Sequence, residues 1–554
     1  MIKCYFTEID DKFDPNKDIV VGPWCVPSIT DAEKIHFVEP YSADEVLTMH
    51  HKLFDLSFFL LNKDIEGKDD QYKKKYFLIK QRDYLFFVFV FFSRYRVLKK
   101  ILATNSISEL IFESVPEPQL KENPNYLSYF KLQESAYIIS KILDCLIVGN
   151  NILKFKNTNK ISENNLESIF SNNNNKMFFS VCKQKVKKSL NFLVNVNGVK
   201  FFKGFLLSCL YRVLNINKKT NHPIFIFEPK INIDDEEIIE FVTIFEKISP
   251  LFIDKQLNNH CRMKKVPRLA IFNPGFIYND EIINIVDASL KGKTRLIILQ
   301  HGSYYGTIKK HFAREIEYNL ATFFSYGKQI TSYLERKNVI NFLPNPYLSS
   351  IANKYIFKKQ NNILWVTGAN CKEGDGLELV YGTMVICYMR NKEILYNNLK
   401  EDVKKLLLYK TLNDSAIVFH DIMKDVIPKE QQYTSNHNII TCMLNSKIIF
   451  LDYYGTPFYE AMSMNVPIIL GLLESDPLFT HDALLIFKKF EDAGVVYRNF
   501  KDIANFFNQL EHLDIKKWWY DEKIQSIRRE FLEKYANNKP YFWPWVKAIL
   551  KRQI

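Results

Sequence analysis

The sequence predicts an α/β protein with two doubly wound halves, each a parallel sheet covered by helices. From about residue 178, short apolar runs alternate with amphipathic stretches, and most runs are separated by a helix-length segment. Several runs end in Gly, Asp, His or Asn, residues that are common where a strand of a parallel sheet ends and a loop begins. The runs are HPIFIFEPK, RLAIFNPG, RLIILQHG, TFFSYG, NILWVTG, SAIVFHD, NIITCML, KIIFLDYYGT and VPIILG.

Chain length and a break in the run of predicted strands indicate the domain boundaries. At 554 residues the chain is too long for one core and should divide into two or three domains. The run of strands breaks near 330–360, where prolines and a basic pair precede a new strand at Ile363. We expect a strand plus a mainly helical region over 1–175, a first half over 176–335, a second half over 336–515 and a C-terminal helix over 516–554.

The ends of the chain carry helical patterns. DIVVGPWC is strand-like, and a helix should follow with Ser42 as N-cap and Glu45 three residues on, a capping box. Residues 71–145 are largely helical in pattern, apart from YLFFVFVFF, a buried element whose aromatic and β-branched residues also fit a strand. KKWWYDEKIQSIRREFLEKYA predicts one long amphipathic helix near the C-terminus.

Composition limits the classes of function. The formal charge of +13 favours an anionic partner, but no recognised nucleic-acid motif accompanies it, so we expect no nucleic acid. The nine cysteines include no CxxC pair, and no His cluster occurs, so we expect neither a disulfide framework nor a zinc site. The charged N-terminus lacks a signal peptide pattern, and YLFFVFVFF is too short to span a bilayer, which predicts a cytoplasmic protein.

One candidate site follows the buried run LIIL. In an open parallel sheet the ligand binds beyond the carboxyl ends of the strands, and Gln300, His301 and Gly302 occupy such an end. His301 can act as a general base, as a phosphate ligand when protonated or as a neutral donor. A structural histidine bonded to a backbone carbonyl is the alternative.

The second candidate lies in KIIFLDYYGTPFYEAMSMNVPIILG. A strand ends at Asp452, Gly455 and Thr456 form a turn, and a helix opens at Pro457. The N-terminus of that helix is suited to phosphate, and Glu460 lies one turn in, within reach of a ribose. An ordinary turn with a capping Thr and a solvated Glu is the alternative.

The third candidate is NILWVTGANCKEGDG, the first strand of the second half with its exit loop. Thr367 and Gly368 would approach the same phosphate from the opposite side. A plain turn is equally compatible with this stretch.

Several motifs together resemble a transferase family of bacterial surface-carbohydrate (O-antigen) biosynthesis, first noticed in spirochaetes. QHGSYYGT is close to the family's Gln-His-Gly-Gly-x-Tyr-Gly-Thr, and LDYYGTPFYEAMSMNVPIIL is similar to its Tyr-x-Ser-Thr-Thr, Glu and Asn-x-Pro segment. The supporting matches are VVGPWC, QRDYLFFVFVFFSRYRVL, FEDAGVVY and the pair Trp518-Trp519.

This resemblance implies a glycosyltransferase of B-type architecture, in which two Rossmann-like domains face each other across a cleft, here with a helical N-terminal elaboration. The second half would bind a nucleotide-sugar through Thr367, Gly368, Asp452, Gly455, Thr456 and Glu460. Gln300, His301 and Gly302 would be the catalytic group facing it from the first half. No metal or other cofactor is expected, because a helix dipole and basic groups can neutralise the leaving phosphate.

The implied donor is a nucleotide-sugar, with a CMP-linked Kdo or nonulosonate sugar favoured by analogy, and the acceptor is a glycan or lipid-linked glycan. Peripheral contact with the inner face of the cytoplasmic membrane fits such an acceptor. A polyol-phosphate transferase of the teichoic-acid type and a non-catalytic scaffold of a glycan assembly complex are the alternatives.

Three departures from the family pattern affect the site. Ser303 replaces a glycine, and Gly455 stands where the family favours a hydroxyl residue. LLLYKTLNDSAIVFHD lacks the expected Arg-Leu-Tyr, so the anion contact of that Arg would have to come from His420 or a nearby Lys.

Overall fold

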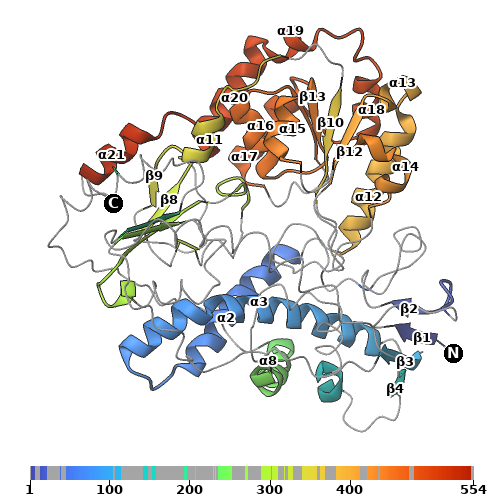
Figure 1. The fold of residues 1–554 in the computed structure, drawn as a ribbon. Helices are drawn as coiled ribbons and strands as arrows, with labels where there is room; N and C mark the ends of the chain where they lie inside the picture. Colours follow the sequence, from blue (N-terminus) through green and yellow to red (C-terminus); the bar gives the residue numbers. More distant parts are fainter. Residues whose placement is uncertain are drawn as a thin grey trace.

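The computed structural model of the chain describes residues 2–5, 13–20, 38, 41, 45–103, 107–113, 141–146, 153–156, 192–195, 206, 229, 231, 235–251, 269–272, 288–300, 302–309, 317–318, 322–328, 340–357, 362–368, 382–411, 421–433, 437–472 and 479–550. Three parallel sheets and the helices around them form an α/β protein (Figure 1), which confirms the predicted fold class at that level. Within these residues, no helix is long and apolar enough to cross a membrane.

The N-terminal part contains a sheet that the sequence did not predict. Four parallel strands lie in the order β2-β1-β3-β4, where a single strand was expected. Their bounds are β1 Ile2–Tyr5, β2 Ile19–Val20, β3 Ile107–Glu113 and β4 Leu153–Lys156. β3 lies within the region whose pattern suggested helix, so that part of the prediction is wrong. Its sequence, ISELIFE, alternates imperfectly and is flanked by helical patterns, which hid the strand.

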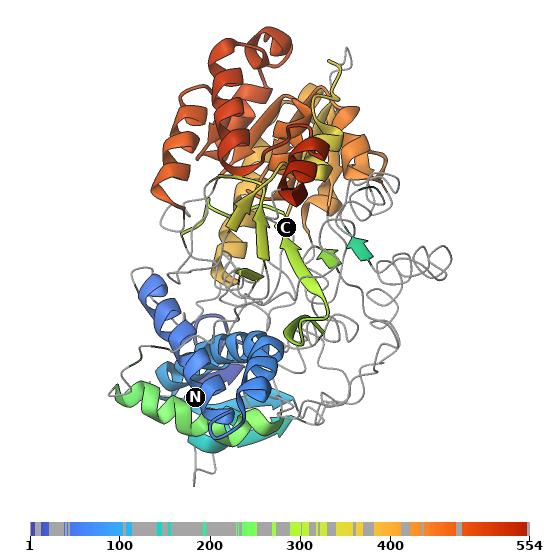
Figure 2. The same ribbon diagram turned by 90° about the vertical axis from the view of Figure 1, so that its left-hand side faces the viewer.

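Two long helices, α2 (Val46–Asp64) and α3 (Asp70–Ala103), pack side by side in the same part of the chain (Figure 2). YLFFVFVFF lies inside α3, so it is helical, and its described residues are buried. The predicted capping box is wrong, because α2 begins at Val46 with Glu45 as an N-cap residue that makes no side-chain cap bond. Ser42 lies outside the described residues.

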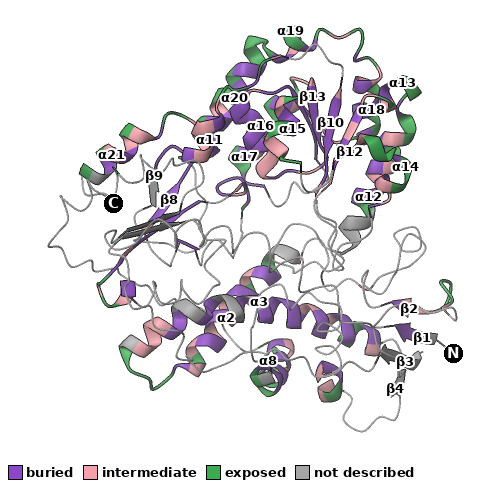
Figure 3. Cartoon of the chain, in the orientation of Figure 1, coloured by how far each residue is buried: buried purple, intermediate pink, exposed green. Residues whose placement is uncertain are grey.

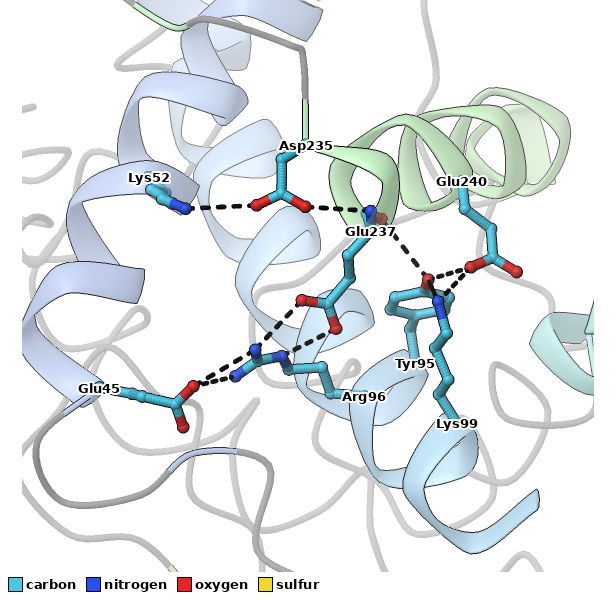
Figure 4. A network of polar contacts seen from close by, with 8 residues as sticks. All are labelled: Glu45, Lys52, Tyr95, Arg96, Lys99, Asp235, Glu237 and Glu240. Carbon is cyan, nitrogen blue, oxygen red and sulfur yellow. Dashed lines mark hydrogen bonds and ion pairs between the residues drawn. The ribbon is translucent and has the colours of Figure 1, made fainter. Parts of the chain in front are cut away.

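The Glu45 carboxylate instead takes part in a network that attaches α8 (Glu236–Ile248) to α2 and α3 (Figure 4). Arg96 of α3 donates from Nε and Nη2 to Glu237, at 2.9 and 3.1 Å, and also pairs with Glu45 at 3.4 Å. Lys52 pairs with Asp235 at 3.3 Å, and Lys99 pairs with Glu240 at 2.5 Å. These contacts hold the acidic start of α8 against the N-terminal helices.

The second sheet contains five parallel strands in their chain order, β5-β6-β7-β8-β9. Their bounds are β5 Phe192–Asn195, β6 Leu269–Phe272, β7 Arg295–Leu299, β8 Thr322–Ser325 and β9 Ile340–Phe342. The helix that attaches to the N-terminal part, α8, lies between β5 and β6 in the chain, so the connection between these two strands includes a helix that packs against α3. HPIFIFEPK lies mostly outside the described residues.

The third sheet has six parallel strands in the order β12-β11-β10-β13-β14-β15. Their bounds are β10 Ile363–Val366, β11 Leu407–Lys410, β12 Gln432–Tyr433, β13 Ile448–Leu451, β14 Ile468–Gly471 and β15 Val496–Tyr497. The chain runs outward from β10 to β12 and then returns to β13 on the other side of β10, which makes a topological switch point between these two central strands. Ligands of open parallel sheets bind at such a point.

Helices cover both faces of the third sheet (Figure 3). Leu364 and Leu451 face one set of helices, and Trp365 and Phe450 face the other. The helices that follow β9 in the chain are α11 Pro346–Ile351, α12 Gly382–Asn398, α13 Glu401–Lys404, α14 Met423–Val426, α15 Ile439–Leu444, α16 Thr456–Met464, α17 His481–Glu491, α18 Phe500–Phe507, α19 Ile515–Trp519, α20 Glu522–Tyr535 and α21 Phe542–Leu550, of which α21 packs on the second sheet. Each face is therefore buried, as expected for a doubly wound sheet.

Two predicted elements of this half are wrong. NIITCML, predicted as a strand, is the short helix α15, which starts behind an Asn438 side chain that accepts from the Thr441 N–H. The predicted long C-terminal helix is two helices, α19 and α20, because Asp521 caps a new start by accepting from the Lys523 N–H. In both cases a local cap overrides the apolar pattern.

The C-terminal segment contacts the second sheet as well as the third. Asn537 donates its N–H to the Tyr326 carbonyl and accepts from the Asn345 N–H, at 2.9 and 2.8 Å. Gly327 allows this close approach, since a methyl group on it would lie 2.1 Å from the Lys534 carbonyl oxygen. Phe531 of the same segment packs edge-on against Phe458 of α16 at 5.1 Å.

Replacing Arg96 with Met should weaken the attachment of α8. The change keeps an apolar stem but leaves the half-buried Glu237 carboxylate without its bidentate partner, so we expect a loss of about 1–3 kcal/mol in the local opening free energy. Hydrogen exchange of α8 amides measures this directly. Lys99→Met is the control: its pair with Glu240 is exposed and should be worth less than about 1 kcal/mol. Equal protection in both variants would contradict the role given to Arg96.

Candidate functional site at the carboxyl edges of two sheets

The loop after β7 turns sharply. Gly302, Tyr304 and Gly306 all have left-handed backbone conformations, with φ of 70°, 80° and 76°. Glycine adopts this conformation at little cost, but a tyrosine does not, so Tyr304 must be held by its surroundings. With left-handed residues at three alternate positions, the chain turns away from β7 and reaches the loops of the third sheet within a few residues.

The buried Gln300 amide fixes the start of this loop. Its Nε2 donates to the Gly302 carbonyl at 3.1 Å, and its Oε1 accepts from the Ser325 hydroxyl and the Tyr326 N–H, both at 3.1 Å. These bonds connect the loop to the end of β8. Both ends of the side chain are therefore bonded to protein groups, as in a residue that positions its neighbours. His301, between Gln300 and Gly302, lies outside the described residues, and its role stays a prediction.

The same loop lies directly against the second half. A methyl group on Gly302 would come 2.7 Å from Thr456 Oγ1, so the two candidate motifs are in contact. The Tyr304 hydroxyl donates to the Tyr454 carbonyl at 2.7 Å. Thr480 adds two bonds, from its N–H to the Thr307 carbonyl at 2.9 Å and from its hydroxyl to the Gly306 carbonyl at 3.0 Å.

Thr456 is the first residue of α16, one position earlier than predicted, and the N-cap is Gly455. Gly455 makes no side-chain cap, and a methyl group on it would lie 2.5 Å from the Tyr453 ring. Glycine fits at this position because the Tyr453 ring occupies the space that a side chain would take. The N–H groups of this turn and the helix dipole favour an anion such as phosphate.

Glu460 lies one turn further along α16 and is 6% exposed. The Tyr347 hydroxyl of α11 donates to its Oε1 at 2.8 Å. Burial raises the pKa of Glu460 to about 7, and the bond from Tyr347 offsets only part of this. Near neutral pH the carboxyl group can therefore hold or release a proton. The predicted contact of Glu460 with a ribose stays a prediction.

Thr367, Gly368 and Asp452 meet at the carboxyl ends of β10 and β13. The Tyr388 hydroxyl connects them: it lies 2.8 Å from the Thr367 hydroxyl, accepts from the Gly368 N–H at 2.9 Å and donates to Asp452 Oδ1. The indole N–H of Trp365 donates to Asp452 Oδ2 at 2.7 Å. Asp452 is thus buried and bonded on both oxygens, and burial raises its pKa while Lys392 opposes the rise.

Lys392 of α12 is the cation of this network, and its side chain is fully buried. Its Nζ lies 3.3 Å from Asp421 and 4.0 Å from Asp452, and Tyr409 donates to the same Asp421 oxygen at 2.6 Å. The sequence analysis missed Lys392, Tyr388 and Asp421. The only available signal was the spacing of Tyr388 and Lys392, which puts both on one face of a helix.

A basic residue does lie near the position of the missing Arg. Lys410 ends β11 and is 7% exposed, and its carbonyl accepts from the Thr367 N–H at 3.1 Å. Burial lowers the pKa of Lys410. His420, the other predicted substitute, lies outside the described residues. Among the residues that the structure describes, no three His, Cys, Asp or Glu side chains gather as a metal site.

The fold and these contacts define an α/β protein in which the carboxyl edges of two parallel sheets meet, the place where parallel sheets bind ligands in general. A family model described as LIC12162 family transferase matches residues 4–550. The chain therefore belongs to this family of transferases, which confirms the resemblance drawn from its motifs. No curated protein matches the chain.

Replacing Gly302 with Ala should disturb the contact with Thr456. The left-handed φ costs about 1–2 kcal/mol, and the new methyl group adds a clash with Thr456 Oγ1. Thr456→Ala removes that oxygen, so the double variant should lose about 1 kcal/mol less than the sum of the single losses. Denaturant unfolding of the four proteins measures the coupling. Gly67→Ala is the control, because Gly67 has φ 75° with nothing within 4 Å. Additive losses for Gly302 and Thr456 would mean that the two residues are not in contact.

Glu460 should make the second half less stable as pH rises. Its pKa is raised from 4.5 to about 7 in the folded protein, so the folded state binds the proton more tightly. Stability is therefore lost between about pH 4.5 and pH 7, by up to about 3 kcal/mol. Glu460→Gln removes this titration, so the variant should gain on the parent in melting temperature from pH 5 to pH 8. Parallel pH profiles for the two proteins would show that Glu460 titrates normally.

Proposed function

We propose that the protein is a glycosyltransferase that moves a sugar from a nucleotide-activated donor onto a surface polysaccharide or lipopolysaccharide glycan. Membership in a transferase family supports transfer chemistry. The observation that carries the proposal is the contact between Gly302, at the carboxyl edge of the second sheet, and Thr456, at the N-terminus of α16. A donor phosphate on α16 would lie beside the loop that contains His301.

In this proposal the donor phosphate binds the first turn of α16, through its N–H groups and the Thr456 hydroxyl. Lys410, at the end of β11, supplies the positive charge that the missing Arg would have given. Helix dipole and lysine together would stabilise the departing nucleotide without a metal. A CMP-linked Kdo or nonulosonate sugar is the donor we favour, and its carboxylate would add a second negative charge.

The proposed transfer step needs one base. The acceptor hydroxyl oxygen forms a bond to the anomeric carbon, and the bond from that carbon to the donor phosphate oxygen breaks. His301 takes the hydroxyl proton, and the electron pair of the broken bond stays on the phosphate. Gln300 would hold the backbone that follows β7, through its bonds to Ser325 and Tyr326. Glu460, with a pKa of about 7, would bind the ribose hydroxyl groups in either protonation state.

Nucleotide binding tests the donor site. CMP, CDP, UDP and GDP are each added to the protein in a thermal-shift assay, and one of them should raise the melting temperature, because a saturating ligand adds a few kcal/mol of stability. Thr456→Ala should weaken that ligand about tenfold or more, as expected for loss of a charge-assisted hydrogen bond. Thr441→Ala, an exposed helical threonine of α15, is the matched control. Stabilisation by none of the nucleotides would overturn the proposal.

Turnover measurements and product analysis then distinguish sugar transfer from polyol-phosphate transfer and from a scaffold role. His301→Ala should lower turnover about 10²-fold while nucleotide binding and melting temperature stay close to the parent values. Mass analysis of the product distinguishes sugar transfer from transfer of a polyol phosphate, which would add phosphate to the acceptor. Nucleotide binding without turnover on any acceptor would indicate a scaffold.

A further inference from the structure

The C-terminal helix α21 has apolar residues on two sides. Its inner side is built into the protein: Trp545 is 2% exposed, stacks on Phe324 at 6.1 Å and donates its indole N–H to the Pro344 carbonyl at 3.1 Å. Ala548 is buried beside it. These contacts fix the rotation of the helix about its own axis, and so they also fix which residues face outward.

The outer side of α21 carries a stripe of Trp543, Val546, Lys547 and Leu550, at helical spacings of three and four residues. Trp543 is 69% exposed and Leu550 is 51% exposed, while Lys547 is exposed between them. Phe342 in β9 is 49% exposed and lies two residues before Pro344, to which the helix is bonded. Figure 3 shows α21 at the outer edge of the molecule. Burial in this chain does not account for these large apolar side chains, because the inner side already supplies the packing.

The C-terminal segment that contains α21 is basic in sequence. Residues 534–554 contain five Lys or Arg residues and no Asp or Glu. Three of these cations lie in the described part of the chain: Lys539 and Lys547 are exposed, whereas Lys534 pairs with Glu530 at 3.0 Å. The whole chain also carries a formal charge of +13. Tryptophan together with lysine, on the outer side of a helix, is the combination that favours the headgroup region of an anionic bilayer.

We propose that the outer stripe of α21 docks the protein onto the surface of a membrane that contains anionic lipid. Trp543 and Leu550 would enter the boundary between headgroups and acyl chains. Lys547 and Lys539 would contact lipid phosphates. An apolar stripe alone would fit a protein partner equally well, but a stripe with an exposed lysine between its apolar residues, in a chain of formal charge +13, is matched in charge to an anionic lipid surface. This docking does not depend on the proposed sugar transfer, since it needs neither donor nor acceptor.

Vesicle flotation tests the docking on the full chain. The probes are vesicles of phosphatidylcholine, with and without phosphatidylglycerol, at low and at high salt. We expect binding to the anionic vesicles that weakens at high salt. Trp543→Ser combined with Leu550→Ser should weaken binding about tenfold or more, by removing apolar area. Lys547→Glu should weaken it about fivefold or more. Leu485→Ser, a half-exposed leucine on α17, and Lys516→Glu, an exposed lysine on α19, are the matched controls and should bind as the parent does.

Three outcomes would overturn the docking. The first is a parent protein that does not float with anionic vesicles. The second is equal weakening by the α21 variants and by their controls, which would mean that general charge or hydrophobicity governs binding. The third is a dimer that Trp543→Ser dissociates, in a protein that binds no vesicles, because a second copy would then cover the stripe. Circular dichroism and melting temperature of each variant confirm that the comparison is between folded proteins.

Discussion

The candidate site depends on the contact between the turn at 302–308 and the loops of the third sheet. A tyrosine at φ 80° costs about 1–2 kcal/mol, and the Tyr304 hydroxyl bond to the Tyr454 carbonyl helps to hold this conformation. Thr480 bonds to the carbonyls of Gly306 and Thr307, so the turn is held on both sides. Without these bonds the turn would have no fixed place beside α16, and the edges of the two sheets would not form one site.

The central strands of the two larger sheets were predictable because each is a short apolar run that ends at a small or polar residue. RLIIL, TFFS, ILWV, IIFL and IILG are the examples in the structure. The same rule failed for NIITCML and left YLFFVFVFF open between helix and strand, because apolar content does not distinguish a buried helix from a strand over so few residues. The N-terminal sheet was missed because β3 pairs with β1 across more than a hundred residues and β4 pairs with β3 across more than forty, and no local pattern encodes these pairings.

The predicted site residues fall into two groups in the structure. Gly302, Gly455 and Thr456 could be predicted, because turn chemistry at strand ends is local to the sequence. The network around Asp452 could not be predicted, because Lys392, Asp421 and Trp365 come from separate elements and meet only after the sheet has formed. The motif predicted the position of Gln300 at the end of a strand. Its three amide bonds, which connect the loop after β7 to the end of β8, could be found only in the structure.

The placement of the C-terminal segment has a consequence for synthesis on the ribosome. Asn537 bonds to Tyr326 and Asn345, and Trp545 bonds to Pro344, so strands β8 and β9 complete their surroundings with residues made about two hundred positions later. The part of the second sheet that the C-terminal segment covers therefore stays exposed until the third sheet has been synthesised and has left the ribosome. Such an exposed edge favours misassociation during synthesis, and the waiting time is set by the rate of translation rather than by the folding of the sheet itself.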